Sequence, residues 1–211
     1  PVNRVYCVGR NYAAHAIEMG HDPNREEPFF FKKAPDNLLP ASESDGGSTF
    51  PYPPKTQDVH HEIELVIALA KGGTDIPVDT AMECIWGFGV GIDMTRRDLQ
   101  GEAKKAGRPW DTGKAFDNAA PMGCLHPIAQ TGNMESGRIW LEVNNKVQQE
   151  GDLNQLIWKI PEIISYLSGL FTLRPCDLIF TGTPSGVGPV SVGDILVGGI
   201  DRLSSIKVTV G

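Results

Sequence analysis

The most regular alternation of side chains lies in residues 60–70, HHEIELVIALA. Alternate isoleucine and leucine residues would share one face of a β-strand here, and Glu62 and Glu64 would share the other. Val66 and Ala68 continue the face of the glutamates, which indicates that this face is also shielded from water. The pattern therefore predicts a strand that carries two carboxylates on a buried face.

Apolar runs separated by glycine and proline predict further short strands. They are expected at residues 4–9, at residues 84–93, and in the late segments DLIFTGT, DILVGG and IKVTV. Residues 138–151 predict a hairpin that turns at Asn144–Asn145, because asparagine tolerates left-handed backbone angles. The proline-rich stretch 35–58 predicts a loop that is too long to be without a function.

Helix formers and end signals predict a few helices. The segment NYAAHAIEMG is rich in alanine and closes on Gly20 as a stop signal. A surface helix is expected over residues 95–107, with Thr95 near its start, and Pro161 suits the first turn of another helix. Shorter helical turns are expected at residues 78–83 and 153–160. Together these elements predict a β-rich α+β fold.

Composition narrows the classes of protein that remain. The 211 residues suit one domain over residues 1–211, and the net charge of −7 argues against a nucleic-acid partner. No stretch approaches 18 uninterrupted apolar residues and the first residues carry no signal-peptide core, so we expect no membrane association. Four cysteines without a C-x-x-C pair predict buried thiols in a reducing compartment, the cytoplasm.

Three carboxylates are candidates for a metal site. Glu62 and Glu64 share a strand face, and two like charges on a buried face need a cation or a shared proton. Asp93 ends another apolar strand and could complete the set. Such oxygen ligands favour Mg²⁺ or Mn²⁺ over zinc, with Ca²⁺ as a further candidate. The alternatives are a half-exposed strand for the glutamates and a helix cap for Asp93.

A histidine and a glutamate on the alanine-rich helix are candidates for proton transfer. His15 and Glu18 are spaced i, i+3, so they lie on one helix face and can touch. A carboxylate that accepts from one imidazole nitrogen leaves the other nitrogen free to take a proton from water. The alternative is a solvated pair on a surface helix.

The remaining polar candidates would each be called structural if taken alone. His60 and His61 are expected to pack or hydrogen-bond locally, and no H-E-x-x-H, P-loop or G-x-S-x-G motif occurs in the sequence. Lys114 follows a loop among small and apolar neighbours, and Thr183 lies where a strand breaks into a Gly/Pro loop. The candidates are Arg97, Gln100, Lys114 and Thr183.

Six blocks occur in order over nearly the whole chain, and together they resemble the fumarylacetoacetate hydrolase family. The blocks are VGRNYAAHAIEMG, PFFFKK, HHEIEL, GIDMTRRDLQ, K-x-F-D-x-x-x-P and FTGTPSGVG. The likeness is strongest to short acylpyruvate hydrolases with a single catalytic domain. It implies mixed β-sheets rolled around a metal site, the C-terminal-domain fold of that family, and a homodimer.

The resemblance also implies roles for the candidates above. Glu62, Glu64 and Asp93 fall on the family's metal ligands. His15 and Glu18 fall on its catalytic dyad, which sits on a helix that orders over the substrate. Lys114 and Gln100 would stabilise an oxyanion. Arg97, Thr183 and Lys33 would bind the substrate. Lys32 or Lys33, together with Arg25, would contact the substrate's distal carboxylate.

The implied activity is metal-dependent hydrolysis of a carbon–carbon bond in a 2,4-dioxo acid, with Mg²⁺ or Mn²⁺. We expect fumarylpyruvate as the substrate, cleaved to pyruvate and fumarate in the gentisate route of aromatic degradation. Maleylpyruvate and simpler acylpyruvates remain alternatives. Rival activities are oxaloacetate decarboxylation, isomerisation or hydration of related dioxo acids, and binding of oxo acids without turnover.

Overall fold

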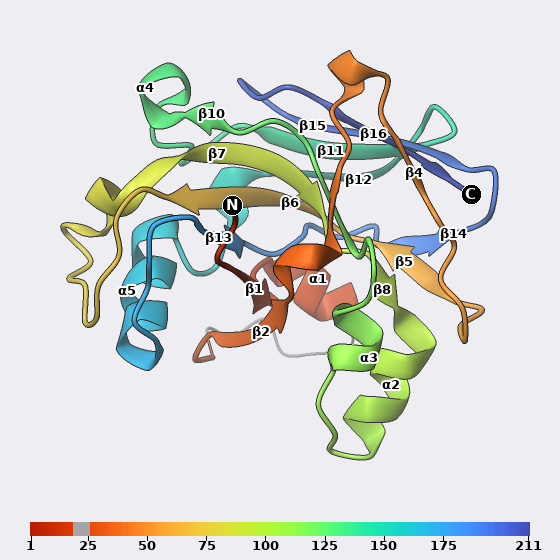
Figure 1. Ribbon diagram of the computed structural model, residues 1–211, viewed down its shortest axis with the longest axis horizontal. Helices are drawn as coiled ribbons and strands as arrows, with labels where there is room; N and C mark the ends of the chain where they lie inside the picture. The colour runs from red at the N-terminus through yellow and green to blue at the C-terminus, as the bar shows by residue number, and fades with distance from the viewer. Residues whose placement is uncertain (19–25) are drawn as a thin grey trace.

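The structure is a computed structural model that describes residues 1–18 and 26–211, and it is built mainly from three β-sheets (Figure 1). The largest sheet has the strand order β2-β1-β13-β6-β7-β9-β3, and β10 pairs with β7. Its strands are β1 Arg4–Gly9, β2 Phe29–Lys33, β3 Leu38–Pro40, β6 Ile63–Leu69, β7 Ile85–Ile92, β9 Ala120–Met122, β10 His126–Pro127 and β13 Asp177–Phe180.

Two smaller sheets complete the β structure. One has the order β12-β11-β15-β16-β4, and the other has the order β14-β5-β8. Their strands are β4 Ser48–Phe50, β5 Val59–His61, β8 Thr95–Arg96, β11 Arg138–Val143, β12 Lys146–Asp152, β14 Gly188–Val190, β15 Ile195–Ile200 and β16 Ile206–Val210. Parallel pairs, such as β1 with β13, occur beside antiparallel ones in the two larger sheets, which are mixed as expected, whereas the pairs of β14-β5-β8 are antiparallel.

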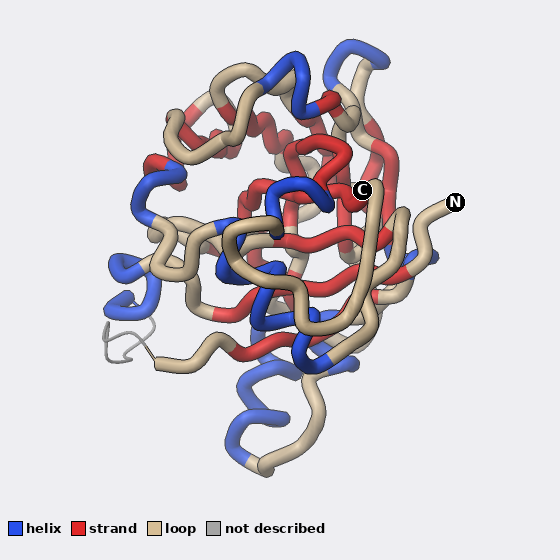
Figure 2. The backbone as a smooth tube through the Cα atoms, turned by 90° about the vertical axis from the view of Figure 1, so that its left-hand side faces the viewer, coloured by secondary structure: helices blue, strands red, loops and turns tan. Residues whose placement is uncertain are grey.

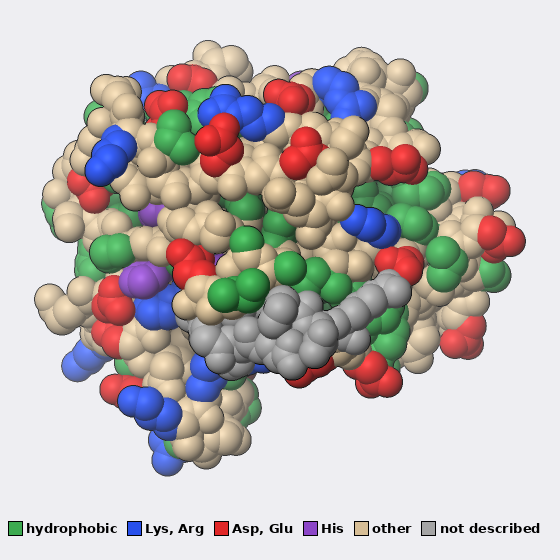
Figure 3. All heavy atoms as spheres, turned by 180° about the vertical axis from the view of Figure 1, so that it is seen from behind, with side chains coloured by type: hydrophobic (Ala, Val, Ile, Leu, Met, Phe, Trp, Pro, Cys, Tyr) green, Lys and Arg blue, Asp and Glu red, His purple; other side chains and the backbone are tan. Residues whose placement is uncertain are grey.

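The helices lie around these sheets, whose strands curve past one another in Figure 2. The α-helices are α1 Ala13–Glu18, α2 Arg97–Lys105, α3 Asp111–Lys114, α4 Ile128–Thr131 and α5 Ile160–Leu170; the 3₁₀ turns are η1 Pro35–Asn37, η2 Glu43–Asp45, η3 Ala81–Cys84 and η4 Leu153–Gln155. No helix in the described part of the chain has the length and apolar character that crossing a membrane requires. On the face drawn in Figure 3, acidic and basic side chains are interspersed.

Strand β6 confirms that both faces of the alternating segment are buried. It lies between β13 and β7, and every one of its residues is buried. The isoleucine and leucine face packs into the main hydrophobic core, and Val66 and Ala68 belong to a second apolar cluster. The expected single strand over residues 60–70 is nevertheless divided, because β5 joins a different sheet and the chain changes sheets at Glu62.

The hairpin β11–β12 is confirmed at its turn. Asn144 and Asn145 have φ angles of 53° and 63°, the left-handed values that the sequence predicted. Further along, the register shifts between Leu141 and Glu142, so Gln148 is an extra residue on β12. This bulge lets Gln149 point inward, where it is fully buried.

Several expectations about local structure need correction. The helix expected over residues 95–107 begins at Arg97, and Thr95 lies in β8 instead of capping the helix. The turn expected at residues 78–83 is the 3₁₀ turn η3. Cys124 and Cys176 are exposed, although all four free cysteines were expected to be buried. The stop expected at Gly20 lies outside the described residues.

Candidate active site

The three candidate carboxylates meet where β6 and β7 lie side by side. Glu62 comes directly before β6, Glu64 lies within it, and Asp93 directly follows β7. The antiparallel register pairs Ile63 with Ile92, which brings Glu62 and Asp93 opposite each other. One carboxylate oxygen of each residue lies within 4.8 Å of the others, and all three residues are buried. Asp93 is therefore part of an acidic cluster and not a helix cap.

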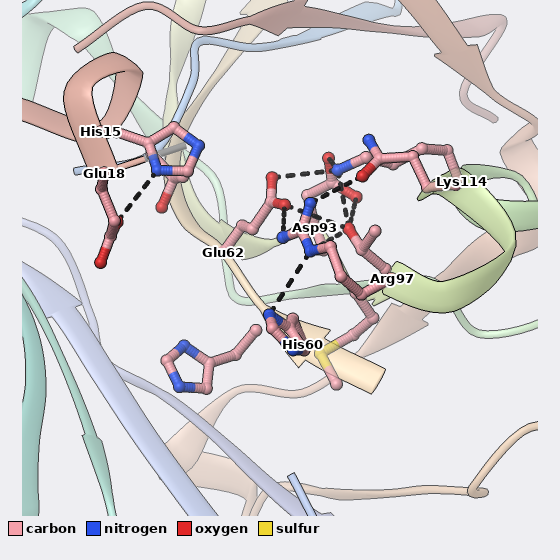
Figure 4. A network of polar contacts seen from close by, with 12 residues as sticks. His15, Glu18, His60, Glu62, Asp93, Arg97 and Lys114 are labelled. Carbon is pink, nitrogen blue, oxygen red and sulfur yellow. Dashed lines mark hydrogen bonds and ion pairs between the residues drawn. The ribbon is translucent and has the colours of Figure 1, made fainter. Parts of the chain in front are cut away.

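Two lysines bind this acidic cluster, and Figure 4 shows one of them, Lys114, beside Glu62 and Asp93. Lys114, the last residue of α3, places its Nζ atom 3.0 Å from Oε2 of Glu62 and 2.7 Å from Oδ2 of Asp93. Its ammonium also donates to the hydroxyl of Thr95 over 2.7 Å. Lys33 lies 2.8 Å from Oδ1 of Asp93 and donates to the backbone carbonyls of Met94 and Lys114. The side chain of Lys33 is fully buried against Asp93, and its expected contact with substrate stays a prediction.

The carboxylates of the cluster differ in protonation. Burial alone would raise the pKa of Glu62, but the charges of Lys114 and Arg97 outweigh it and hold that pKa well below its usual range. Burial raises the pKa of Glu64 well above its usual range, and the charges of Asp93 and Glu62 raise it further. Burial opposes the charge on Lys114, but Asp93 and Glu62 raise its pKa. Glu64 is thus a buried acid that a cation would stabilise in its charged form.

Arg97 joins the acidic cluster to helix α2. Its NH2 atom lies 2.5 Å from Oε1 of Glu62, and its NH1 atom donates to Oε1 of Gln100 over 2.7 Å. The Nε atom faces Nδ1 of His60 at 3.4 Å, and Nε2 of His60 lies 2.8 Å from Asp58. These contacts fix the guanidinium and turn the amide nitrogen of Gln100 away from it.

Gln149 is a residue of the site that the sequence analysis missed. Its Oε1 atom accepts from Nδ1 of His61 and the amide of Ile63, at 2.9 and 3.0 Å. Its Nε2 atom donates to the hydroxyl of Thr183 and the carbonyl of Pro184, both over 2.8 Å. In sequence it is one of two adjacent glutamines in a mostly polar strand, so only the bulge that turns it inward reveals its role.

His15 and Glu18 lie on α1, across from the acidic cluster in Figure 4. Nδ1 of His15 is 3.3 Å from Oε2 of Glu18, and His15 is buried. The Glu18 carboxylate also accepts the backbone amide of Gly186, at 3.0 and 3.1 Å. Burial lowers the pKa of His15, and the nearby charges of Glu62 and Glu18 offset this only in part. The structure therefore brings together a neutral imidazole and an oriented carboxylate.

One pocket connects these groups. It is narrow and partly open to solvent, with a cavity volume of about 30 Å³. Its lining includes His15, Glu62, Glu64, Arg97, Gln100, Lys114 and Thr183. Candidates that are scattered over the sequence thus face one cavity, whereas Lys33 does not line it and Arg25 lies outside the described residues.

The acidic cluster has the chemistry of a site for a divalent metal. Its donors are three carboxylates, the hard oxygen ligands that Mg²⁺ and Mn²⁺ prefer. A cation there would offset the burial and the charges of Asp93 and Glu62, which together raise the pKa of Glu64. The donor set and the protonation of Glu64 both fit such an ion, and Glu62, Glu64 and Asp93 are the residues that could hold it.

Comparison with known proteins finds one matching family and close relatives within it. A family model described as the C-terminal region of fumarylacetoacetate hydrolase matches residues 4–211. A fumarylpyruvate hydrolase from a Ralstonia species is 43% identical over 190 residues, which are 90% of this chain and 96% of that protein. The crystal structure of fumarylpyruvate hydrolase from Pseudomonas aeruginosa, in complex with Mn²⁺ and pyruvate, is 53% identical with a TM-score of 0.96. The match covers 100% of this chain and 90% of that one.

Similar proteins with other names are more distant. An oxaloacetate tautomerase of Mus musculus is 40% identical over 206 residues, 98% of this chain and 90% of that protein. An oxaloacetate decarboxylase of Dictyostelium discoideum is 38% identical over 203 residues, 96% of this chain and 90% of that protein.

Proposed function

Because this chain belongs to the fumarylacetoacetate hydrolase family, we propose that it hydrolyses the C3–C4 bond of fumarylpyruvate, releasing pyruvate and fumarate. Two relatives named fumarylpyruvate hydrolase, at 43% and 53% identity, support this activity over the alternatives. The structural observation that carries the proposal is the pairing of His15 with Glu18, because His15 lines the same pocket as Glu62 and Glu64 of the acidic cluster. The chain is thus a hydrolase that acts on carbon–carbon bonds and uses a divalent metal.

We propose Glu62, Glu64 and Asp93 as the metal ligands, with Mn²⁺ or Mg²⁺ as the ion. A bound divalent cation would polarise the substrate's oxygens and stabilise negative charge on the departing group. Arg97 and Thr183 face the same pocket and are our proposed contacts to the carboxylate at the pyruvyl end. A guanidinium matches the geometry of a carboxylate, and Arg97 is already held in place by Glu62 and Gln100.

We propose His15 as the general base. With Nδ1 directed at Glu18, Nε2 is the free nitrogen that takes a proton from water. The water oxygen then bonds to C4, and the C4 carbonyl becomes an oxyanion that Lys114 and the amide nitrogen of Gln100 stabilise. When the C3–C4 bond breaks, its electron pair stays with C3 as the enolate of pyruvate. The proton held on His15 returns to that carbon, which completes the balance.

Oxaloacetate decarboxylation is the second candidate activity, and relatives named oxaloacetate decarboxylase and tautomerase favour it. It forms the same pyruvate enolate by loss of CO₂ and needs no attacking water. We therefore expect His15→Ala to reduce the hydrolysis of fumarylpyruvate much more than any decarboxylation of oxaloacetate. An equal loss of both activities would contradict this distinction.

The experiment that tests the proposal follows the loss of the enol absorbance of fumarylpyruvate with Mn²⁺, with EDTA, and after Mn²⁺ is restored. Pyruvate is counted in the same run by a coupled assay. Metal-dependent loss with one pyruvate per substrate supports the hydrolase, and maleylpyruvate and acetylpyruvate then rank its preference. No loss of fumarylpyruvate, together with release of CO₂ from oxaloacetate, would move the assignment to the decarboxylase.

Three further properties stay predictions from the family resemblance. They are a single catalytic domain over residues 1–211, a homodimer, and a role in the cytoplasm in the gentisate route. Light scattering of the purified protein tests the dimer, and a mass equal to one chain would contradict it. Loss of growth on gentisate after deletion of the gene tests the metabolic role.

A further inference from the structure

Two cations line the pocket of His15 and have no acidic partner among the residues that the structure describes. Arg10 follows β1, Lys104 lies in the last turn of α2, and both line the pocket. Within residues 1–18 and 26–211, neither side chain takes part in an ion pair or a hydrogen bond. The other pocket cations, Arg97 and Lys114, are bound to Glu62. Among the described residues, Arg10 and Lys104 are therefore the pocket cations that are not bound to a carboxylate.

An aromatic platform holds these two cations at its ends. The guanidinium of Arg10 lies 5.2 Å from the ring centre of Phe29, and the ammonium of Lys104 lies 4.9 Å from the ring of Trp110. The two rings pack edge to face, with centroids 5.5 Å apart. Phe31 adds a third ring at 5.9 Å from Trp110. These rings line the pocket too, so a planar apolar chain could lie on them between the two charges.

The electrostatics of Lys104 favour the binding of an anion in the pocket. Burial, followed by the positive charges of Arg97, Arg10 and Lys114, lowers the pKa of Lys104 to about 8. Glu62 is the carboxylate that opposes these effects, and it does so more weakly. A half-buried ammonium among other cations is unfavourable unless a negative charge enters the pocket.

We propose that Arg10 and Lys104 bind the terminal carboxylate of the acyl group, so that the enzyme prefers 2,4-dioxo acids that carry a second carboxylate. This inference rests on the proposed function and names the part of the substrate that the pocket selects. The acyl chain would lie on the Phe29–Trp110 platform, with its reacting carbonyl toward His15 and its charged end between the two cations.

Other cations near the site are less suited to this role. Lys33 is bound to Asp93, and the ammonium of Lys32 lies over the rings of Tyr6 and Phe171 at 5.2 and 4.3 Å. Arg108 is exposed and lines an adjoining cleft, which shares Phe29, Phe31, Trp110 and Lys114 with the pocket but not His15. The expected distal contacts were Lys32 or Lys33 with Arg25, and Arg25 lies outside the described residues; Arg10 and Lys104 take that role in this proposal.

A structural role is the alternative for Lys104. A lysine in the last turn of a helix is stabilised by the partial negative charge of the helix end, without any ligand. Lys105, its exposed neighbour, lies in the same last turn of α2 but does not line the pocket. Lys105→Met is therefore the matched control for Lys104→Met, and Arg108→Met tests the adjoining cleft.

The test compares kcat/KM for fumarylpyruvate and for acetylpyruvate, which lacks the second carboxylate, in Mn²⁺-loaded enzyme. A lost charge-assisted hydrogen bond predicts a fall of about 10- to 100-fold for fumarylpyruvate in Lys104→Met and in Arg10→Met. Acetylpyruvate should change by less than about threefold, and both control variants should match wild type. Equal losses for both substrates, an unchanged fumarylpyruvate value, or a larger loss in Arg108→Met would overturn the inference.

A measurement of fumarate binding tests this inference independently of the proposed function. Calorimetry needs no turnover, so it tests the subsite even if wild type hydrolyses neither substrate, a result that would overturn the proposed function alone. We expect Lys104→Met to weaken fumarate binding by about the same factor as kcat/KM, and crotonate, which has one carboxylate, to be unaffected. Fumarate binding that is equal in wild type and Lys104→Met would overturn the subsite.

Discussion

The carboxylate of Glu18 accepts a hydrogen bond from the backbone amide of Gly186, 168 residues further along the chain. The same carboxylate faces Nδ1 of His15. The loop after β13 therefore holds the acid that orients the proposed base. Gly186 has a φ of +92°, and a Cβ atom there would lie 1.9 Å from the carbonyl oxygen of Gln148. Any other residue would have to move the loop.

We expect Gly186→Ala to reduce both stability and kcat. The clash with a backbone atom should cost about 1–3 kcal/mol beyond the left-handed strain, since packed backbone gives way only in part. Displacing the amide frees Glu18 and misdirects His15, and kcat should fall by about 10- to 100-fold. Thermal melting and steady-state kinetics measure the two effects.

Gly193→Ala is the control for backbone strain. Gly193 has a φ of +94° and open space around its Cβ position, so alanine there carries the strain without the clash. We expect a loss of about 1–2 kcal/mol in the free energy of unfolding and an unchanged kcat. Equal kcat values in the two variants would show that the Gly186 amide does not position the base.

A second prediction concerns Gln149. It donates to the hydroxyl oxygen of Thr183, so the hydroxyl proton is left to point into the pocket. Gln149→Leu should raise KM more than it lowers kcat, because Thr183 is a proposed substrate contact. It should also destabilise the fold by about 3 kcal/mol, since buried partners lose their hydrogen bonds.

Gln148→Leu is the matched control for that variant. Gln148 is the exposed extra residue of the same bulge, so its replacement should leave KM and the melting temperature close to wild type. A KM for Gln149→Leu that equals wild type, in a protein that still folds, would remove Gln149 from the positioning of the substrate.

Local patterns were enough to predict much of the fold. The alternation in β6 and the Asn144–Asn145 turn follow from side-chain direction and backbone angles, which depend on neighbours in sequence. They also indicated which carboxylates could share a face. The meeting of Glu62 with Asp93 depends on the register of β6 against β7, and a single sequence does not contain that register.

The cations of the site were harder to place, because a lysine looks alike in sequence whether it binds substrate or a buried acid. Lys33 extends from a strand beside aromatic residues, and only the packing of β2 shows that it reaches Asp93. Arg10 and Lys104 come from separate elements and meet at the aromatic platform. Such convergence is a property of the tertiary structure.

The pH dependence of the reaction should report His15. Burial lowers its pKa below the ordinary value of about 6.5, so the imidazole stays neutral and able to accept a proton at that pH. With Mn²⁺ saturating, kcat should be constant above about pH 6.5 and fall as the pH drops further. The Glu18 carboxylate raises the pKa of His15, so Glu18→Gln should move the fall to still lower pH. A fall that begins above pH 7, or one that Glu18→Gln leaves in place, would contradict this assignment.

The last prediction separates the effect of Glu64 on the stability of the fold from its role in binding the metal. The pKa of Glu64 is raised in the folded chain, so its contribution to stability is full below its unfolded pKa and is lost as the pH rises toward the folded value. In EDTA, Glu64→Gln should therefore melt at a higher temperature than wild type at pH 8. The difference should shrink toward pH 4.5, where Glu64 of the wild type stays protonated.

Adding Mn²⁺ should reverse that order. Wild type gains about 2.7 kcal/mol when free Mn²⁺ is 100 times its dissociation constant, whereas Glu64→Gln lacks one charged ligand and should gain much less. Glu102→Gln removes an exposed carboxylate outside the cluster, so it should follow wild type with and without metal. If Glu64→Gln were less stable than wild type in EDTA and equally stabilised by Mn²⁺, Glu64 would be a structural acid. The metal would then have to be held without it.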